Sequence, residues 1–382
     1  MNAKRRKLNS EDVSASEFVF QSFKTEDYLA ILKDLSFIKQ KFCKTKIDDE
    51  SKNEQILSQI FVLVDLFYKI VNNNEYNADK QQSKVLQEAI SIIANLCYYS
   101  SAAKLYMSKA RNPAILFSTL EQLLKKDNVL DKIKNNILRL VGNLILAPCT
   151  MVYFTTNDTL LSKIADFLGA EDENQKENAI KIFKNFASMK FPAAFLNNSA
   201  IQRIGEMILV EEQITKYKED LIKILYFTFS YMKTVAGKQL AITQCPTLLL
   251  SKLQGYVNEE TEDSEWSRCI CSILNKSHDV REAIGTSGLI SFIDNGKECL
   301  SFWKVLSYFA QDAWGRVTLR EYSGLDLIIN HLLTSNDVVE KCLLYEALRH
   351  FIHDSVGIAY LCMKGDLFRP EFIERIVRTQ II

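Results

Sequence analysis

The chain has 382 residues, of which 47% are apolar and 25% are charged. This apolar content excludes a mostly disordered chain, and only 12 Gly and 5 Pro are too few for the many turns of a sheet-rich fold. The 47 basic and 47 acidic residues cancel, which excludes a protein that coats nucleic acid or acidic membranes with its whole surface. The composition predicts a helical fold with at most local patches of charge.

The nine cysteines are odd in number and lie mostly in apolar runs, as Cys97 does after Ile92 and Ile93. Such a distribution is typical of reduced core thiols in a reducing compartment, and no secretory signal precedes them. No stretch reaches the roughly 20 uncharged apolar residues that a bilayer span needs. We therefore expect a soluble intracellular protein that makes no contact with a membrane.

The chain opens with a cationic run that no apolar periodicity accompanies. Residues 1–16 are predicted to form a disordered basic tail that carries the four consecutive cations Lys4, Arg5, Arg6 and Lys7. Such a run resembles a nuclear localisation signal, whose long cations bind the acidic groove of an import adaptor. A solvated tail without function and a phosphate contact to nucleic acid are the alternatives.

Helical periodicity begins after the tail. Apolar residues recur at helical spacing from Tyr28 to Ile38 and again from Ile56 to Phe67. Polar stretches separate these runs, but no long Pro- or Ser-rich linker occurs. Residues 17–84 are predicted to form a helical cap or a degenerate first repeat.

The remaining residues, 85–382, contain an internal repeat. Three copies contain an apolar helix with Asn near its end, as in the run from Ile137 to Leu144. In each of them a second apolar group follows the Asn at a similar distance along the chain. Weaker copies continue the register at intervals of 35 to 48 residues, which centre on the length of a three-helix repeat. The anchor positions of the seven units are Asn95, Asn143, Asn185, Phe227, Ser272, Ser307 and Arg349.

The later copies add a second signature. Arg281 and Arg316 each begin a segment with an apolar pair, and Gly-Leu at 288–289 and 324–325 is predicted to open the next helix. This repeat pattern resembles that of the armadillo repeat family. The resemblance implies an all-α fold, a right-handed α-solenoid of about seven to eight armadillo-type repeats with a concave groove. HEAT-like geometry in places and a single globular helical bundle are the alternatives.

The resemblance also implies a role for the repeated Asn. In armadillo proteins this side chain lines the groove and hydrogen-bonds the main chain of an extended partner, a role that falls here on Asn95, Asn143 and Asn185. The alternative is that each Asn bonds the backbone of its own repeat and stabilises the stack.

The positions one helical turn before the anchors favour cations. Four consecutive repeats place a basic residue there and the last two an aromatic residue, namely Arg139, Lys181, Lys223, Arg268, Trp303 and Tyr345. This register predicts a basic strip for an extended acidic segment, with the two aromatic residues as anchors. Ordinary solvated side chains are the alternative. The Trp that accompanies Asn in import adaptors of this family is absent beside all three Asn, so a general import-adaptor role is not expected.

The sequence offers little for catalysis. His350 and His353 lie near Cys342 and Cys362, but paired Cys-x-x-Cys spacing is absent, and Cys269 and Cys271 fall on different helix faces. No phosphate-binding Gly loop or nucleophile motif occurs. We therefore expect no enzyme, no metal site and no cofactor.

The predicted function is that of a nuclear, non-catalytic scaffold or adaptor, with shuttling to the cytoplasm as an open alternative. It would hold an extended, acidic partner segment in its groove and help to assemble a multiprotein complex. Two alternatives remain open: a substrate-recognition subunit of a ubiquitin ligase and a helical-repeat protein that binds nucleic acid.

Overall fold

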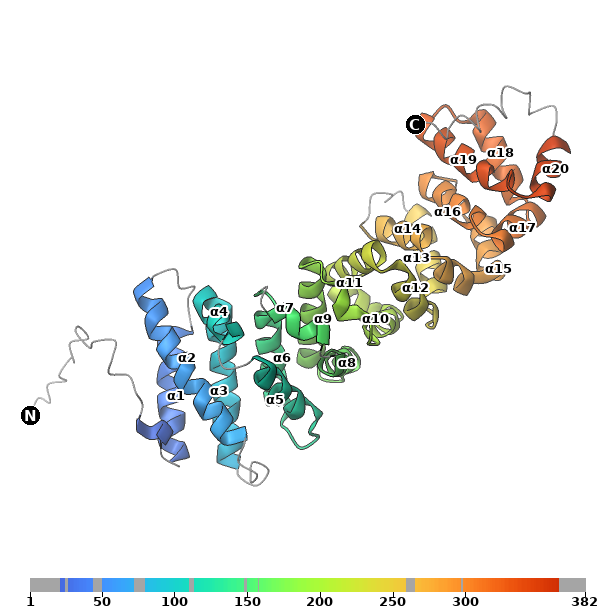
Figure 1. Ribbon diagram of the computed structural model, residues 1–382. Helices are drawn as coiled ribbons and strands as arrows, with labels where there is room; N and C mark the ends of the chain where they lie inside the picture. The colour runs from blue at the N-terminus through green and yellow to red at the C-terminus, as the bar shows by residue number, and fades with distance from the viewer. Residues whose placement is uncertain are drawn as a thin grey trace, which may run out of the picture. The chain divides into compact units, whose positions relative to one another are not determined.

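The computed structural model describes residues 21–24, 27–43, 50–71, 80–109, 113–147, 150–156, 158–258, 265–296 and 298–363. Helices alone, joined by short turns, make up the secondary structure of these residues (Figure 1). The chain divides into two compact units, Met1–Asn198, called the first unit, and Ser199–Ile382, called the second unit.

The first unit is built from helices that repeat in groups of three. Its elements are η1 (Gln21–Lys24), α1 (Tyr28–Phe42), α2 (Glu50–Val71), α3 (Lys80–Tyr99), α4 (Ser101–Lys109), α5 (Pro113–Lys125), α6 (Asp131–Leu144), α7 (Met151–Thr156), α8 (Asp158–Asp166), η3 (Phe167–Gly169), α9 (Glu173–Ser188) and η4 (Pro192–Phe195). The helices α4, α5 and α6 form one repeat, and α7, α8 and α9 form the next. The predicted division after residue 84 falls inside α3, which begins at Lys80.

The last helix of each repeat packs on the last helix of the preceding one. In the first unit α1 packs on α3, α3 on α6 and α6 on α9, and α3 and α6 are seen side by side in Figure 1. We call these four the ladder helices of the first unit. The outer helices α5 and α8 also pack on one another. Each repeat therefore completes its core only with its neighbours, as expected for a repeat array.

An aromatic chain links the core of these repeats. Phe117 of α5 meets Phe154 of α7 edge-on at a centroid distance of 5.1 Å, and Phe154 meets Phe186 of α9 at 5.1 Å. All three rings are buried, and burying such a side chain contributes about 1.5–3 kcal/mol to folding. The Phe residues thus hold together elements that lie up to 69 positions apart in the chain.

The second unit is also built from three-helix repeats. Its elements are α10 (Ala200–Ile208), α11 (Glu211–Tyr231), α12 (Lys233–Ala241), α13 (Cys245–Asn258), α14 (Glu265–Lys276), α15 (His278–Asn295), α16 (Leu300–Ala310), α17 (Ala313–Glu321), α18 (Gly324–Thr334), α19 (Val338–Phe351) and α20 (Ser355–Met363). Its ladder helices are α11, α14, α16 and α19, each packed on the next. All seven predicted anchor positions lie on ladder helices, which confirms the repeat register.

The element α15 of the second unit contains two helices of one repeat. Within α15, Gly285 has φ +66° and ψ −176°, a conformation that only glycine adopts readily. The segments on either side correspond to the first and second helices of a repeat. The second helix was expected to open at Gly288, so the break lies three residues earlier than predicted. At the next repeat the expectation is met, because Gly324 begins α18.

Arginine–aspartate pairs join successive repeats of the second unit. Arg281 is buried and donates to the main-chain oxygens of Leu274 and Asn275 at the end of α14. Its guanidinium Nε and Nη2 also donate to Asp312, at 2.6 and 3.0 Å, just before α17. One side chain thus ties the end of a ladder helix to the start of the following repeat.

The same device recurs one repeat later. Arg316 donates to the carbonyls of Ala310 and Gln311, and Arg316 and Arg320 both donate to Asp354, at 3.4 and 2.7 Å. Burial alone would raise the pKa of Asp354, but the Gly357 N–H and the two guanidinium groups outweigh it and hold that pKa below its ordinary value. The recurrence explains the Arg that the sequence repeats at these two positions.

Candidate functional site

A polar groove crosses the four ladder helices of the first unit. It has a volume of about 500 Å³. No apolar side chain lines it, and the lining residues are Lys39, Gln87, Glu88, Ser91, Lys132, Asn135, Asn136, Arg139, Asn174, Glu177, Asn178 and Lys181. Two of the predicted site residues, Arg139 and Lys181, therefore share one groove.

The groove carries more positive than negative charge. Of its two carboxylates, Glu88 accepts from Lys39 at 2.9 Å and Glu177 is paired with Lys181 one turn away. Lys132 is exposed and has no acidic partner among the described residues. Arg139 likewise pairs with no acid there, since its guanidinium donates to amide oxygens. Two cations thus remain for an incoming anion.

Arg139 is held in place by two amides of the ladder. Its Nη2 donates to Oδ1 of Asn95 on α3, and its Nη1 donates to Oδ1 of Asn136 at 3.3 Å. The predicted site residue Asn95 therefore positions the predicted cation Arg139 across the α3–α6 seam. These bonds keep the charge of Arg139 while fixing where it lies.

Asn143 and Asn185 bond the backbone of the preceding repeat. The amide of Asn143 donates to the Ala94 carbonyl at 2.8 Å, and that of Asn185 donates to the Gly142 carbonyl at 3.0 Å. Each acceptor directly precedes the anchor Asn of the repeat before. The bond therefore runs to the backbone of the preceding repeat, and not to that of the same repeat as in the alternative. Each amide still has its second N–H and its Oδ1 without a partner among the described residues.

The groove contains a second row of amides that was not predicted from the sequence. Asn136 and Asn178 lie seven residues before Asn143 and Asn185, two helical turns back on the same face. Asn136 repeats the cross-repeat bond, since it donates to the Gln87 carbonyl at 3.0 Å. The seven-residue spacing from the anchors was the available signal.

In the second unit two of the predicted cations lie in the open. Lys223 on α11 and Arg268 on α14 are exposed and form no ion pair within the described part of the chain. Tyr345 on α19 is half-buried. These residues lie on ladder helices of the second unit, whereas Arg139 and Lys181 lie on those of the first.

Trp303 is wrong as a groove anchor. Its side chain is completely buried and its ring stacks on His331, with centroids 4.2 Å apart. The next residue, Lys304, reaches the surface in its place, because neighbouring residues on a helix point about 100° apart. The run of cations therefore continues through α16 at Lys304, one position later than the predicted register.

The histidines and cysteines form no metal site within the described ranges, where no group of three potential ligands occurs. Partial burial lowers the pKa of His350, and so do Arg349, Arg316, His353 and Arg281. Cys97, Cys245, Cys269 and Cys271 are buried free thiols, and burial raises the pKa of Cys97 to about 12. Such thiols are poor nucleophiles. None of the described helices is both long and apolar enough to cross a bilayer.

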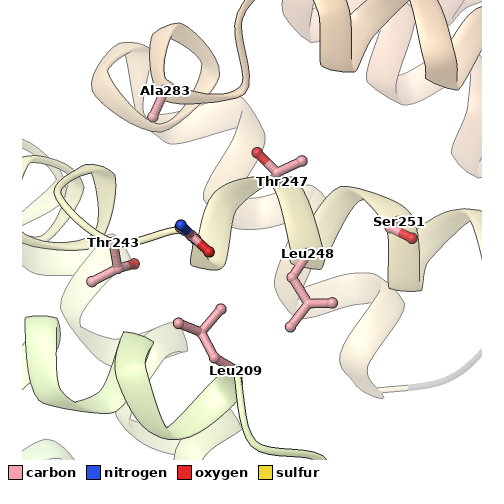
Figure 2. A pocket seen from close by; sticks show the side chains of 7 residues that line it. Leu209, Thr243, Thr247, Leu248, Ser251 and Ala283 are labelled. Carbon is pink, nitrogen blue, oxygen red and sulfur yellow. The ribbon is translucent and has the colours of Figure 1, made fainter.

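A second hollow, of about 660 Å³, lies among the outer helices of the second unit. Figure 2 shows Leu209 from the end of α10, Leu248 and Ser251 from α13, and Thr243 and Thr247 around it, with Ala283 of α15 on the far side. Gln244 completes its lining. It contains no ionisable side chain, so it offers neither acid–base chemistry nor charge to a ligand. The cationic tail, Lys4 to Lys7, lies outside the described residues.

Comparison with known proteins finds the fold and no sequence family. No family model matches the chain, and no curated protein matches it. An engineered protein from the Northeast Structural Genomics Consortium is 13% identical and has a TM-score of 0.51, over 94% of this chain and 96% of its own. Similarity at this identity shows the fold alone.

Two further solved structures are similar to shorter parts of the chain. A designed armadillo repeat protein is 16% identical with a TM-score of 0.49, over 66% of this chain and 98% of its own. Computationally designed armadillo repeat proteins for modular peptide recognition are 16% identical with a TM-score of 0.46, over 69% and 97%. With its three-helix repeats and packed ladder helices, the chain has an armadillo-like repeat fold, and the expected all-α repeat fold is confirmed.

Proposed function

We propose that this protein is a non-catalytic scaffold that binds an extended, acidic segment of a partner protein in the groove of the first unit. The carrying observation is the lining of that groove, which is wholly polar and includes two cations without acidic partners. An apolar ligand would gain nothing there. A polar main chain with acidic side chains finds both hydrogen bonds and charge.

The amides would bind the main chain of the segment. An unpaired extended strand presents alternating N–H and C=O groups, and an Asn side chain offers a donor and an acceptor to such groups. Asn174 and Asn178 make no hydrogen bond to described residues, and Asn143 and Asn185 keep one N–H and Oδ1. Bonds to these groups would not depend on the partner's side chains.

The cations would select acidic side chains. Three steps between ladder helices at about 8–10 Å each span about 24–30 Å, the length of about eight extended residues. Lys132 and Arg139 would meet carboxylates along that length. The attraction is screened by salt, so the affinity should fall as the ionic strength rises.

We further propose that the scaffold works in the nucleus. The run Lys4 to Lys7 supports this location, because four consecutive cations fit the acidic groove of an import adaptor. Replacing all four by Ala in a fluorescent fusion should move the protein from nucleus to cytoplasm. Unchanged nuclear accumulation would sink the targeting role.

The test of the groove uses fluorescent peptides with alternating Glu and Thr, about twelve residues long to cover the groove at about 3.3 Å per residue. The full-length protein should bind this peptide and not its Lys–Thr counterpart. Lys132→Glu with Lys181→Glu should weaken binding at least tenfold, because each reversal replaces an attraction by a repulsion.

A matched control is available on the outer side of the same unit. Lys125 and Lys181 are both 51% exposed and both are paired with a Glu one turn away. The variant Lys125→Glu with Lys126→Glu therefore carries the same change of charge outside the groove, and should bind like the unmodified protein. Equal loss in both variants would mean that only net charge matters and would refute the groove.

A further inference from the structure

A row of cations crosses three ladder helices of the second unit. Lys223 lies on α11, Arg268 on α14 and Lys304 on α16, and each helix packs on the next. Lys223 and Arg268 are exposed and Lys304 is partly exposed. Since neighbouring packed helices lie about 8–10 Å apart, the row presents one charge about every 8–10 Å.

Side-chain bonds between these helices set their register. The ammonium of Lys276 donates to Oγ of Ser230 at 3.0 Å, which joins α14 to α11. The amide of Gln311 donates to Oδ1 of Asn275 at 3.2 Å, which joins α16 to α14. The same sequence offsets, within one residue, connect Lys223 to Arg268 and Arg268 to Lys304. The three cations therefore lie at about the same height along the axes of their helices.

None of the three cations forms an ion pair with a described residue. Lys304 acts on the Cys271 thiol: burial raises the pKa of that thiol to about 11, and the Lys304 ammonium and the Ser301 hydroxyl partly offset this rise. This contrasts with the first unit, where Lys39 and Lys181 are each paired with a Glu. The row in the second unit is thus open to a polyanion.

Tyrosines lie one turn beyond two of these cations. Tyr226 follows Lys223 on α11 and is 53% exposed, and the Lys276 ammonium lies 5.4 Å from its ring centroid. Tyr308 follows Lys304 on α16 and is partly exposed. Burial, and then Cys271 and Glu346, raise the pKa of Tyr308, so its ring stays neutral. Two rings, one on α11 and one on α16, therefore lie beside the outer two of the three charges.

We propose that this face of the second unit binds single-stranded nucleic acid, with Lys223, Arg268 and Lys304 on phosphates and Tyr226 and Tyr308 stacked on bases. Proteins that bind single strands combine a cationic track with aromatic platforms in this way. A duplex fits poorly, because its bases are already stacked and closed to the rings. An acidic peptide would use the cations but has no need of the rings, and the amides that suit a peptide main chain lie in the first unit.

The test measures anisotropy of fluorescein-labelled oligo(U) and oligo(dT) of about twelve nucleotides, within the usual site size. The full-length protein with Lys4, Arg5, Arg6 and Lys7 replaced by Ala removes the contribution of the tail. Binding of either strand, with a hairpin duplex bound at least tenfold more weakly, is the expected result. Lys223→Glu with Arg268→Glu should weaken binding at least tenfold and lower the salt slope by about 1.4, since each phosphate contact contributes about 0.7.

Two matched variants separate local from general effects. Lys233→Glu with Lys238→Glu changes the same charge on α12, where both lysines are exposed, and should leave binding intact. Tyr226→Ala should weaken binding at least about fivefold, whereas Tyr322→Ala, which removes a ring 44% exposed just after α17, should not. Circular dichroism and thermal melting establish that each variant is folded, and Lys223→Ala with Arg268→Ala replaces the reversal if it is not.

Three results would overturn the proposal. They are no binding of either strand at about 50 mM salt, where phosphate contacts are strongest, equal effects of the α12 control and the cation-row variant, and normal binding by Tyr226→Ala. The groove variant of the first unit, Lys132→Glu with Lys181→Glu, should still bind the oligonucleotides. The two proposals therefore fail independently.

Discussion

The two units hold their repeats together by different bonds. In the first unit, Asn143 and Asn185 on the ladder helices donate to the backbone of the preceding ladder helix. In the second unit, Arg281 and Arg316 at the start of each repeat pair with an Asp of the next. Both devices bridge neighbouring repeats, but one uses Asn side chains of the ladder helices and the other uses Arg side chains of the first helix of the repeat.

This difference accounts for the chemistry of the two faces. Where amides stack the repeats, one of them, Asn136, also lines the groove, and an amide partly occupies one of its cations, as Asn95 does with Arg139. Where Arg–Asp pairs join the repeats, the ladder helices no longer carry the repeated Asn, and Lys223, Arg268 and Tyr226 remain available. The loss of the repeated Asn after Asn185 is therefore a change of joining device within an unchanged three-helix plan.

The largest effect is expected from breaking an Arg–Asp pair. Asp312→Asn leaves the Arg281 guanidinium, 5% exposed, without its counter-charge, and removing one partner of a buried pair costs about 3–5 kcal/mol. Hydrogen exchange read by mass spectrometry should show that backbone amides lose protection in the second unit, while those of the first unit keep theirs.

The control for this change is Glu282→Gln. Glu282 lies 3.6 Å from His278 and is 68% exposed, so its loss should cost less than about 1 kcal/mol. If Asp312→Asn is as mild as this control, the pair is not what joins the repeats.

A smaller loss is expected from the break in α15. Gly285→Ala places a side chain where φ is +66°, although nothing lies within 4 Å of the new Cβ. The cost is therefore pure backbone strain, about 1–3 kcal/mol, and appears as a lower melting temperature. Gly255→Ala in α13, also without a neighbour within 4 Å, should be neutral or stabilising by about 0.4–1 kcal/mol. The same loss at both positions would contradict the strain.

The smallest effect on stability is expected from removing an amide that joins repeats of the first unit. Asn143→Ala removes the bond to the Ala94 carbonyl and should lower the stability of the first unit by about 1 kcal/mol. Asn174→Ala in the same groove removes no bond to a described residue and should leave the urea midpoint unchanged. Both variants should weaken the Glu–Thr peptide if the groove holds it. A peptide affinity that neither variant changes would leave Asn143 with a stacking role alone.

The repeat architecture could be predicted because its signals are local. Apolar periodicity, the Asn at the end of an apolar helix and the recurring Arg identified the ladder helices and their register. Lys223 and Arg268 were correctly expected at the surface for the same reason. The prediction for Trp303 was wrong because its repeat is short. Neighbouring residues on a helix point about 100° apart, so a register error of one residue selected the buried Trp303 ring instead of Lys304.

The partners of these side chains could not be read from the sequence. Asn143 and Ala94 are 49 residues apart, and Arg281 and Asp312 are 31 apart, so neither pair follows from helical spacing. The groove residues Asn136 and Asn178 became evident only when four ladder helices brought them together.

The sequence by itself determined that this protein is a stack of helical repeats and which helix of each repeat forms the ladder, because periodicity within one helix sets its buried side. Only the tertiary structure decided which charges are paired and which are free. Pairing depends on neighbours that lie a full repeat away in the chain, and on rotations of one residue that decide whether a side chain faces the core or the solvent.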